Sequence, residues 1–586
     1  MSISDHVKRY LTAIYGDQLS SDIFERLKDV LQGFHEKQIS AGSQRKTFSE
    51  QDVILITYPD QFTSSQEKPL KTMRTFMDRY LGELINSVHV LPFFPFSSDE
   101  GFSIIDYRSV REDLGSWQDV RKIGDSYALM LDAVINHISQ ESDWFQAFLD
   151  DHPKYKDYFI TEDPNTDLSE VVRPRTSPLL KEVDTRNGTQ YVWTTFSEDQ
   201  IDLNFANPEL LLEIIALMLF YVEMGARIIR LDAVAYLWKE AGTSSIHRPQ
   251  THLIIKLLRA ILDEVAPEVS LVTETNVPHE ENIQYFGEID LISGYSDEAQ
   301  LIYQFPLAPL ILHTFISENS QAITQWAKGI SPPSNSTHFI NFIASHDGIG
   351  LMPAKGLLTQ NEIDRLVAIT RANGGQISHK TNQDGSPSPY ELNITLFDAL
   401  HNPLEGNESA DIQRFIASQA IMLSLAGIPG IYVHSLFGSR NHQQKQELHN
   451  TARKINRERF EIESLEKELS DPSSLKSQVF TKYLALLEKR KQVPPLHPNA
   501  PQVVLELGAS FFGLLRGPGE QGDYLLSITN ITTQPKTLEL PLPSNVSPAS
   551  AAWRDDFSGK EISAENGVLK LDLAPNEFLW LTTQGT

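Results

Sequence analysis

The 586-residue sequence contains no cysteine, which excludes disulfide bonds and thiolate metal sites. Cationic residues are scarce, because 50 Lys and Arg stand against 77 Asp and Glu and leave a formal net charge of −27. A chain with this charge repels nucleic acid and anionic membrane surfaces, so neither is an expected partner. An anionic substrate would require cations concentrated at its own site.

Long apolar runs are also missing. The longest, residues 210–224, is interrupted by Glu213 and Glu223 and is too short to cross a bilayer, so we interpret it as a buried helix. Residues 1–8 lack the apolar core of a secretory signal. We therefore expect a cytoplasmic protein, in which 40% hydrophobic residues supply an ample globular core.

The apolar segments that are present are short and are separated by helical patterns. Eight of them are typical of buried strands, and the sixth is the weakest. They span residues 52–57, 87–91, 128–134, 226–231, 269–273, 288–292, 337–343 and 428–433. Continuously apolar strands that alternate with helices indicate an α/β fold with a covered parallel sheet, and eight such units fit a (β/α)8 TIM barrel.

Two long polar segments interrupt this repeat, after the third and seventh strands. We expect both to be insertions at the carboxyl-end rim, where active sites of such barrels lie. After a charged helical segment, short alternating strands predict a C-terminal antiparallel β domain. The expected barrel comprises residues 1–142, 201–345 and 412–494, the insertions residues 143–200 and 346–411, and the β domain residues 495–586.

The fourth strand ends in Arg230-Leu-Asp232. Side chains alternate along a strand, so Arg230 and Asp232 point the same way. An adjacent arginine keeps an aspartate ionised, as a nucleophile requires. A structural ion pair at a strand end is the alternative interpretation.

Further carboxylates follow other strands, namely Glu274 after the fifth and Asp347 after the seventh. In a barrel these ends meet at one mouth, so we expect Asp232, Glu274 and Asp347 to surround one pocket. Paired carboxyls are what cleavage of a glycosidic bond needs, because one attacks the anomeric carbon and the other protonates the leaving oxygen. Each motif by itself also fits a helix cap or a loop anchor, and the prediction rests on their order.

These motifs resemble the four signature regions of the α-amylase superfamily, glycoside hydrolase family 13. The matching segments are Asp132-Ala-Val-Ile-Asn-His137, Arg230-Leu-Asp-Ala-Val234, Glu274 within Val-Thr-Glu-Thr, and Ala344-Ser-His-Asp347. The sequence is similar in particular to the sucrose phosphorylase subfamily, through residues 91–107, 230–236, 345–350 and 452–457. The resemblance extends over nearly the whole chain.

The resemblance implies a role for each matching position. Asp232 would be the nucleophile, Glu274 the general acid/base, and Asp347 the residue that holds the glucosyl hydroxyls. Further implied substrate contacts are Arg230 beside the nucleophile, Asp99 and Arg453 at the 4-hydroxyl, His137 and His346 at other hydroxyls, Phe102 on the sugar face, Tyr236 near the nucleophile, and Arg175 or its neighbour Arg173 at phosphate. The alternatives are that Phe102 is ordinary core and that the two arginines bridge acidic loops.

Metal and cofactor expectations also follow from the resemblance. Asn136 matches a calcium ligand of many amylases, but the sucrose phosphorylase subfamily generally lacks this ion. We therefore predict no metal and no cofactor, with inorganic phosphate as co-substrate.

Asp132, in the body of its strand, is expected to be a buried hydrogen-bonding hub.

The implied reaction is a double displacement by a retaining α-glucoside phosphorylase. Asp232 would form a covalent glucosyl ester, and phosphate would attack it to give α-D-glucose 1-phosphate. On the acceptor side, Asn276 replaces a histidine of sucrose phosphorylases, and residues 276–282 are closer to the branch that acts on glucosylglycerate. We expect 2-O-α-glucosylglycerate to be the first substrate, sucrose the second, and glucosylglycerol or sucrose 6′-phosphate to follow.

Two other classes remain open from the sequence. One is a hydrolase or transglucosidase of the same superfamily that uses water or a sugar as final acceptor. The other is a non-catalytic sugar-binding protein, although a binder has no need of all three carboxylates. A monomer and a homodimer are both compatible with the sequence.

Overall fold

The computed structural model describes residues 5–37, 44–382, 386–442, 452–519, 521–542 and 552–583. Eight parallel strands close into a barrel in the order β1-β18-β14-β13-β12-β11-β6-β3, which confirms the predicted fold class. The strands are β1 (Ile54–Thr57), β3 (Ser87–Val90), β6 (Ala128–Ala133), β11 (Ala226–Leu231), β12 (Ser270–Thr273), β13 (Leu301–Tyr303), β14 (His338–Asn341) and β18 (Ile428–Tyr432).

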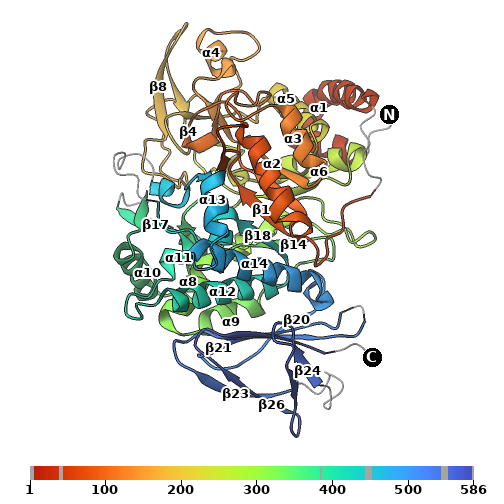
Figure 1. Ribbon diagram of the computed structural model, residues 1–586. Coiled ribbons are helices and arrows are strands. Elements are labelled where there is room, and N and C mark those ends of the chain that lie inside the picture. The colour runs from red at the N-terminus through yellow and green to blue at the C-terminus, as the bar shows by residue number, and fades with distance from the viewer. Residues whose placement is uncertain are drawn as a thin grey trace.

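Helices surround this barrel (Figure 1). They include α2 (Pro69–Tyr80), α3 (Trp117–Gly124), α5 (Pro208–Glu223), α6 (Pro249–Val265), α8 (Leu307–Ser317), α9 (Gln321–Lys328), α12 (Glu408–Ser424), α13 (Ile462–Leu469) and α14 (Leu475–Lys491). Helix α5 buries most of its side chains, as predicted for residues 210–224. A long N-terminal helix, α1 (Asp5–Glu36), packs against α5 and α6. None of the described helices combines the length and the apolar character that a membrane crossing requires.

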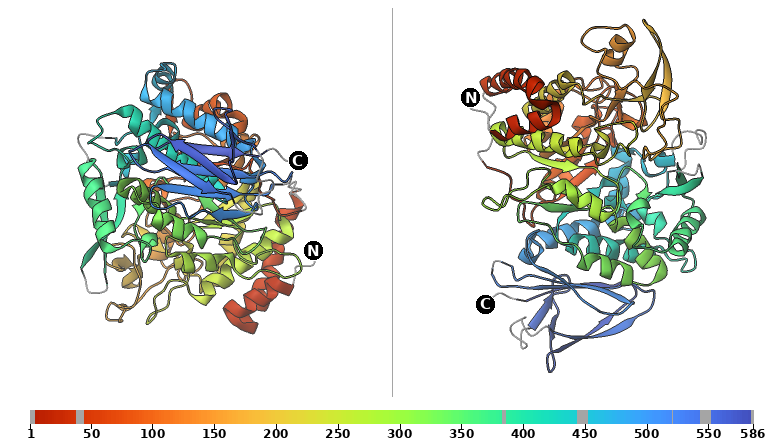
Figure 2. Two further views of the ribbon diagram at one scale, coloured as in Figure 1. Left: turned by 90° about the horizontal axis from the view of Figure 1, so that it is seen from below. Right: turned by 180° about the vertical axis from the view of Figure 1, so that it is seen from behind.

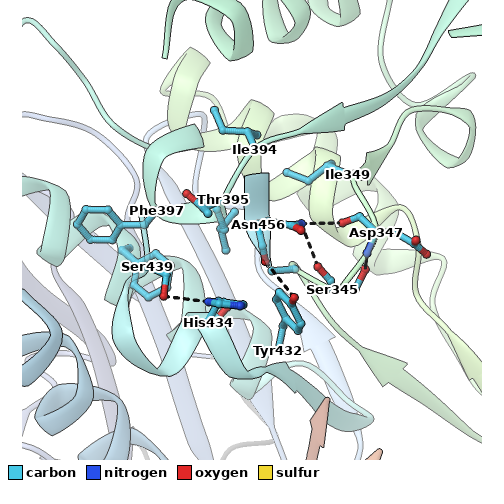
Figure 3. Close-up of a pocket in the computed structure, with 14 residues that line it drawn as sticks. Ser345, Asp347, Ile349, Ile394, Thr395, Phe397, Tyr432, His434, Ser439 and Asn456 are labelled. Carbon is cyan, nitrogen blue, oxygen red and sulfur yellow. Dashed lines mark hydrogen bonds between the residues drawn. The ribbon is translucent and has the colours of Figure 1, made fainter. Parts of the chain in front are cut away.

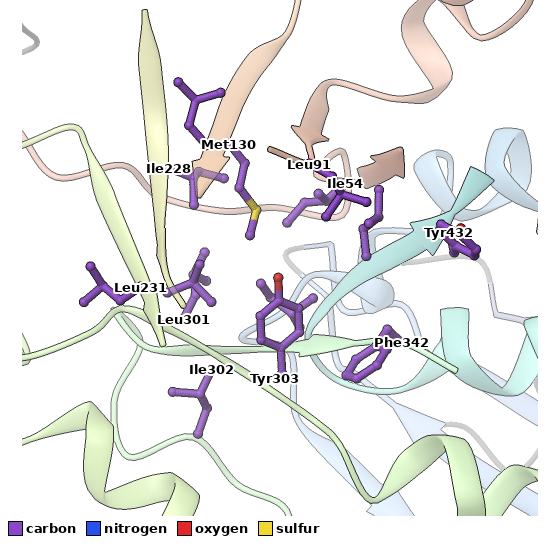
Figure 4. Close-up of a cluster of buried hydrophobic side chains, with 14 of the residues drawn as sticks. Ile54, Leu91, Met130, Ile228, Leu231, Leu301, Ile302, Tyr303, Phe342 and Tyr432 are labelled. Atoms are coloured by element: carbon purple, nitrogen blue, oxygen red, sulfur yellow. The ribbon is translucent and has the colours of Figure 1, made fainter. Parts of the chain in front are cut away.

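The barrel interior is filled by apolar side chains that several strands contribute (Figure 4). Ile54, Met130, Ile228 and Leu301 are among them, and each is at most 2% exposed. Burial is nearly continuous along these strands because helices cover the outer face of the parallel sheet while side chains fill the inside. The closed core fixes where each strand ends and therefore where the residues that follow it lie.

The sixth strand is not where the sequence indicated. Residues 288–292 were predicted as this strand, but they form an exposed turn in which Leu291 is 99% exposed. The sixth barrel strand is β13, and it pairs with β12 and β14. The prediction from apolar composition was wrong here because β13 has only three residues and is too short to show a strand pattern.

Both long polar segments contain β hairpins. After β6 and β7 (His137–Ser139) come α4 (Asp143–Leu149), the hairpin of β8 (Leu180–Thr185) with β9 (Gly188–Trp193), and β10 (Gln200–Asp202), which pairs with β7. After β14 come β15 (Ile349–Gly350), α10 (Gln360–Ala372), β16 (Gln376–Thr381) and β17 (Pro387–Asn393). The three strands form one antiparallel sheet. Both segments thus follow the carboxyl ends of barrel strands.

The C-terminal part is an antiparallel β domain, as predicted. Its main sheet has the order β20-β21-β22-β27-β24-β25, and β23 pairs with β26. The strands are β20 (Gln502–Val504), β21 (Phe511–Arg516), β22 (Leu525–Asn530), β23 (Lys536–Pro541), β24 (Ala552–Asp555), β25 (Glu561–Ser563), β26 (Val568–Leu573) and β27 (Phe578–Thr582). This domain lies at the opposite end of the molecule from β8 (Figures 1 and 2).

Candidate active site

A chain of buried charges lies beneath the expected nucleophile. Nη1 of Arg230 on β11 is 2.7 Å from Oδ1 of Asp232 and 2.6 Å from Oδ1 of Asp132 on β6. His89 on β3 donates from Nε2 to Oδ2 of Asp132 at 2.7 Å. Although burial alone would raise the pKa of Asp132, His89 and Arg230 lower it to about 2. Asp132 therefore holds Arg230 in place, as expected for a buried hub.

The backbone after Asp232 connects the nucleophile to the expected acid/base. Ala233 adopts a left-handed conformation with φ of 49°, and its N–H donates to Oε2 of Glu274 at 3.0 Å. Glu274 follows β12, the neighbour of β11 in the barrel. The left-handed turn at Ala233 thus ties the Glu274 carboxyl to the backbone of the residue that directly follows Asp232.

The two carboxyls have different electrostatic surroundings. Burial raises the pKa of Glu274 to about 7, and the nearby Asp232 and Asp347 carboxylates contribute while Arg230 opposes the shift. Burial also raises the pKa of Asp232, but Arg230 at 2.7 Å opposes it directly and favours the carboxylate. A protonated Glu274 beside an ionised Asp232 is the pair that a retaining glycosidic reaction needs.

Asp347 is fixed by the segment that follows β18. Nη1 of Arg453 lies 2.7 Å from its Oδ1. Burial would raise the pKa of Asp347, but Arg453 and His346 lower it well below its usual range. Asn456, on the same 3-10 helix η7 (Ala452–Asn456) as Arg453, donates from Nδ2 to the carbonyls of Ser345 at 3.2 Å and Asp347 at 3.1 Å (Figure 3).

One cavity brings the predicted residues together. Every predicted catalytic and substrate-binding residue lines it except Tyr236, whose ring instead packs edge-on against Phe196 at 5.4 Å. The lining comprises Asp99, Phe102, His137, Arg175, Phe196, Gln200, Arg230, Asp232, Ala233, Glu274, Asn276, His346, Asp347, Tyr390, Glu391 and Arg453.

The cavity lining also combines polar groups with an aromatic pair. The ring of Phe102 stacks on that of His346 at 5.2 Å, and the residue belongs both to the cavity lining and to the buried apolar core. His137 donates from Nε2 to the Phe102 carbonyl at 2.8 Å. Gln200 donates to Oδ2 of Asp99 at 3.2 Å. Burial lowers the pKa of His346 to about 3, so this imidazole is neutral and suited to a sugar hydroxyl.

The two candidate phosphate arginines occupy different places. Arg175 lines the cavity beside Phe196, and its guanidinium carbon is 5.6 Å from the centre of that ring. Within the described ranges, no carboxylate pairs with Arg175. Arg173 is directed into its own loop, where Nη2 donates to the carbonyls of Pro178 and Thr194, each at 3.1 Å. Arg175 is therefore the cation available to an anion in the cavity.

Five lining residues were not predicted from the sequence, namely Ala233, directly after Asp232, and four residues of the insertions. Phe196 and Gln200 come from the first insertion, and Tyr390 and Glu391 come from β17 in the second. The only signal that could have indicated them is their position in rim insertions, since no strand-end motif marks them.

An ammonium group lies beside Asn136, the residue that matches a calcium ligand of many amylases. Nζ of the buried Lys239 lies 2.6 Å from Oδ1 of Asn136 and 3.2 Å from Oδ2 of Asp202. The lysine thus satisfies oxygens that would otherwise attract a cation. No cluster of three or more His, Asp or Glu suited to a metal occurs among the described residues.

A second, smaller cavity is also lined by Asp347 (Figure 3). Ser345, Tyr432, His434 and Asn456 are among its lining residues. It contains neither Asp232 nor Glu274, so the larger cavity is the candidate active site.

The sequence matches the model of the α-amylase catalytic domain over residues 56–347. A glucosylglycerate phosphorylase from Spirochaeta thermophila is 43% identical over 99% of this chain and 98% of that protein. A sucrose phosphorylase from Streptococcus mutans is 28% identical over 72% of this chain and 84% of that protein. The crystal structure of sucrose 6F-phosphate phosphorylase from Thermoanaerobacter thermosaccharolyticum superposes with a TM-score of 0.72 at 22% identity, covering 91% of this chain and all of that one. These findings confirm the resemblance drawn from the sequence.

Proposed function

The chain belongs to the α-amylase family, glycoside hydrolase family 13, and on that premise we propose that it is a retaining phosphorylase of 2-O-α-glucosylglycerate. One observation carries the chemistry. Asp232 is paired with Arg230 at 2.7 Å, while burial raises the pKa of Glu274 to about 7. At neutral pH the first group is therefore suited to attack and the second to donate a proton.

The reaction proceeds in two displacements at the anomeric carbon. Asp232 attacks the α-glucoside and forms a glucosyl ester, while Glu274 protonates the oxygen of the departing glycerate. Phosphate then attacks the anomeric carbon on the face that glycerate has left, gives a proton to the Glu274 carboxylate and releases the Asp232 carboxylate, so that α-D-glucose 1-phosphate forms with retention. Asp347 is held ionised by Arg453 and binds sugar hydroxyls more strongly as positive charge develops on the ring.

Phosphate must compete with water for the glucosyl ester. Arg175 supports this step, because its charge is not cancelled by a described carboxylate and it borders the cavity. The same cation suits the carboxylate of glycerate in the first displacement. Since glycerate leaves before phosphate arrives, one arginine can serve both anions in turn.

The choice of glucosylglycerate over sucrose rests on the acceptor side. Asn276 lines the cavity where sucrose phosphorylases carry a histidine, and the glucosylglycerate phosphorylase relative matches nearly the entire chain at 43% identity. The sucrose phosphorylase relative matches less of the chain, at 28% identity. Sucrose is the second candidate substrate.

The test is a panel of glucosides with and without phosphate. Glucosylglycerate, sucrose, glucosylglycerol and sucrose 6′-phosphate are each supplied to the enzyme, and glucose 1-phosphate and free glucose are measured. We expect glucosylglycerate with phosphate to give the highest kcat/KM for glucose 1-phosphate. Strong turnover of sucrose alone would reverse the ranking, and full-rate release of glucose without phosphate would identify a hydrolase.

The remaining parts of the proposal concern the setting of the reaction. Phosphate is the co-substrate, and neither a metal nor another cofactor takes part. The cytoplasm is the proposed location, because it supplies phosphate and retains a charged sugar phosphate.

A further inference from the structure

The second insertion reaches the cavity through β17. In the ladder with β15, Glu391 stands opposite Gly350 and Leu392 opposite Ile349. At Gly348 a Cβ atom would lie 3.0 Å from Cβ of Glu391 and 2.9 Å from the carbonyl oxygen of Leu392, so glycine permits the close approach. The segment that follows Asp347 therefore packs directly against β17 and places the 3% exposed Glu391 at the cavity.

The Glu391 carboxylate binds Arg453 through two hydrogen bonds. Nη2 donates to Oε1 at 2.7 Å and Nε donates to Oε2 at 3.2 Å. The remaining nitrogen, Nη1, lies 2.7 Å from Oδ1 of Asp347. One guanidinium is thus shared between carboxylates of the second insertion and of the seventh strand end, and the fork geometry defines its orientation.

The backbone that carries Arg453 is fixed at a neighbouring point. Asn456, three residues along η7, is hydrogen-bonded to the carbonyls of Ser345 and Asp347 (Figure 3). Arg453 itself extends towards the cavity from this anchor, and its direction is set by Glu391 and Asp347 together. If Glu391 lost its charge, Asp347 would have to orient the guanidinium without the bidentate partner on its other side.

The negative charge of Glu391 also affects which ligands Arg453 can bind. Arg453 between two carboxylates carries no surplus positive charge, whereas Arg175 keeps its own. A neutral sugar hydroxyl can accept a hydrogen bond from Arg453, but a phosphate ion gains little there because Asp347 and Glu391 repel it. Phosphate is directed to Arg175 instead.

We propose that Glu391 is a positioning residue that holds Arg453 against Asp347 and cancels its charge, so that the glucose subsite binds a neutral sugar and excludes phosphate. The inference rests on the proposed glucosyl transfer. It assigns to the second insertion a part in building the glucose subsite.

The experiment uses three variants, namely Glu391→Gln, Arg453→Lys and the double variant that combines these two changes. The control variant is Asp364→Asn. Asp364 is an exposed carboxylate on α10 of the same insertion, so its variant makes the same charge change away from the cavity. Glucose affinity is measured from the rise in Tm with increasing glucose, first without and then with excess inorganic phosphate. Glucose binding needs no phosphorolysis, so the glucoside panel and this test can fail separately.

We expect Glu391→Gln and Arg453→Lys each to weaken glucose binding by about 10-fold or more, and the double variant to be no weaker than Arg453→Lys alone. Phosphate should compete with glucose in Glu391→Gln but not in the wild type or Asp364→Asn. Glucose affinity of Glu391→Gln within twofold of Asp364→Asn, effects that multiply in the double variant, or an absence of phosphate competition would each overturn the proposal.

Discussion

Arg230 on β11 and Asp232, directly after the end of that strand, are joined by a hydrogen bond of 2.7 Å, and the same guanidinium nitrogen reaches Asp132 at 2.6 Å. The proposed nucleophile therefore accepts a hydrogen bond from an arginine that is itself held by a buried carboxylate, and this arginine favours the ionised form of Asp232 against the effect of burial. The reactivity of Asp232 is therefore expected to depend on Arg230 and Asp132.

Replacement of Arg230 by lysine keeps the charge but loses the planar fork. We expect kcat/KM for glucosylglycerate to fall by about 100-fold, because a single ammonium cannot satisfy Asp132 and Asp232 with the same geometry. The measurement is steady-state phosphorolysis at several pH values. An unchanged kcat/KM would show that ionisation of Asp232 does not depend on the guanidinium.

Glu274→Gln removes the proposed proton donor. Burial raises the pKa of Glu274 to about 7, so its acid form persists well above the usual range and cleavage should decline as the pH rises through about 7. The variant should lose this decline and react about 10²- to 10⁴-fold more slowly with glucosylglycerate. It should react much less slowly with α-glucosyl fluoride, whose leaving group needs no proton. An equal loss with both substrates would contradict the acid role.

Arg175→Leu should raise KM for phosphate by about 10-fold or more, and KM for glycerate in the synthetic direction by a similar factor, because one cation serves both anions. Arg186→Leu is the matched control, since Arg186 is an exposed arginine between β8 and β9 of the same insertion. A rise in one KM without the other would separate the phosphate site from the glycerate site.

Asn276→His tests the acceptor side. Asn276 lines the cavity next to Gly350, where a Cβ atom would lie 3.1 Å from its amide. The larger imidazole should shift the ratio of sucrose to glucosylglycerate turnover by roughly 10-fold towards sucrose. Competition between the two glucosides in one vessel measures this ratio, and an unchanged value would remove Asn276 from acceptor selection.

Lys239→Met tests the buried ammonium. Loss of the charge leaves Oδ1 of Asn136 without the ammonium and the buried Asp202 carboxylate without its counter-ion, and we expect the free energy of unfolding to fall by about 3 kcal/mol. Lys156→Met, the same change at an exposed position, should shift it by less than about 0.5 kcal/mol. Urea denaturation of both variants gives the comparison, and equal values would contradict a structural role.

The barrel was predictable because its buried strands are apolar and separated by helices. The exception is informative. Residues 288–292 have the composition of a strand but lie in an exposed turn, whereas β13 is too short to stand out. A period cannot be read from three residues, and only closure of the barrel requires them to be a strand.

The positions of Asp232, Glu274 and Asp347 were predictable for a different reason, since carboxyl ends of parallel strands meet at one mouth. Glu391 and Gln200 were not, because strands of the insertions bring them to the cavity and no sequence period fixes the path of an insertion. The sharing of Arg453 between Asp347 and Glu391 depends on contacts between segments distant in sequence.

The most direct test of the account is to identify the residue that carries the glucosyl group. The enzyme is incubated with 5-fluoro-α-D-glucosyl fluoride in the absence of phosphate, digested, and mapped by mass spectrometry. The account predicts a glucosyl ester on Asp232 that phosphate and glycerate both discharge. A label on another residue, or no label in an enzyme that turns over glucosylglycerate, would contradict it.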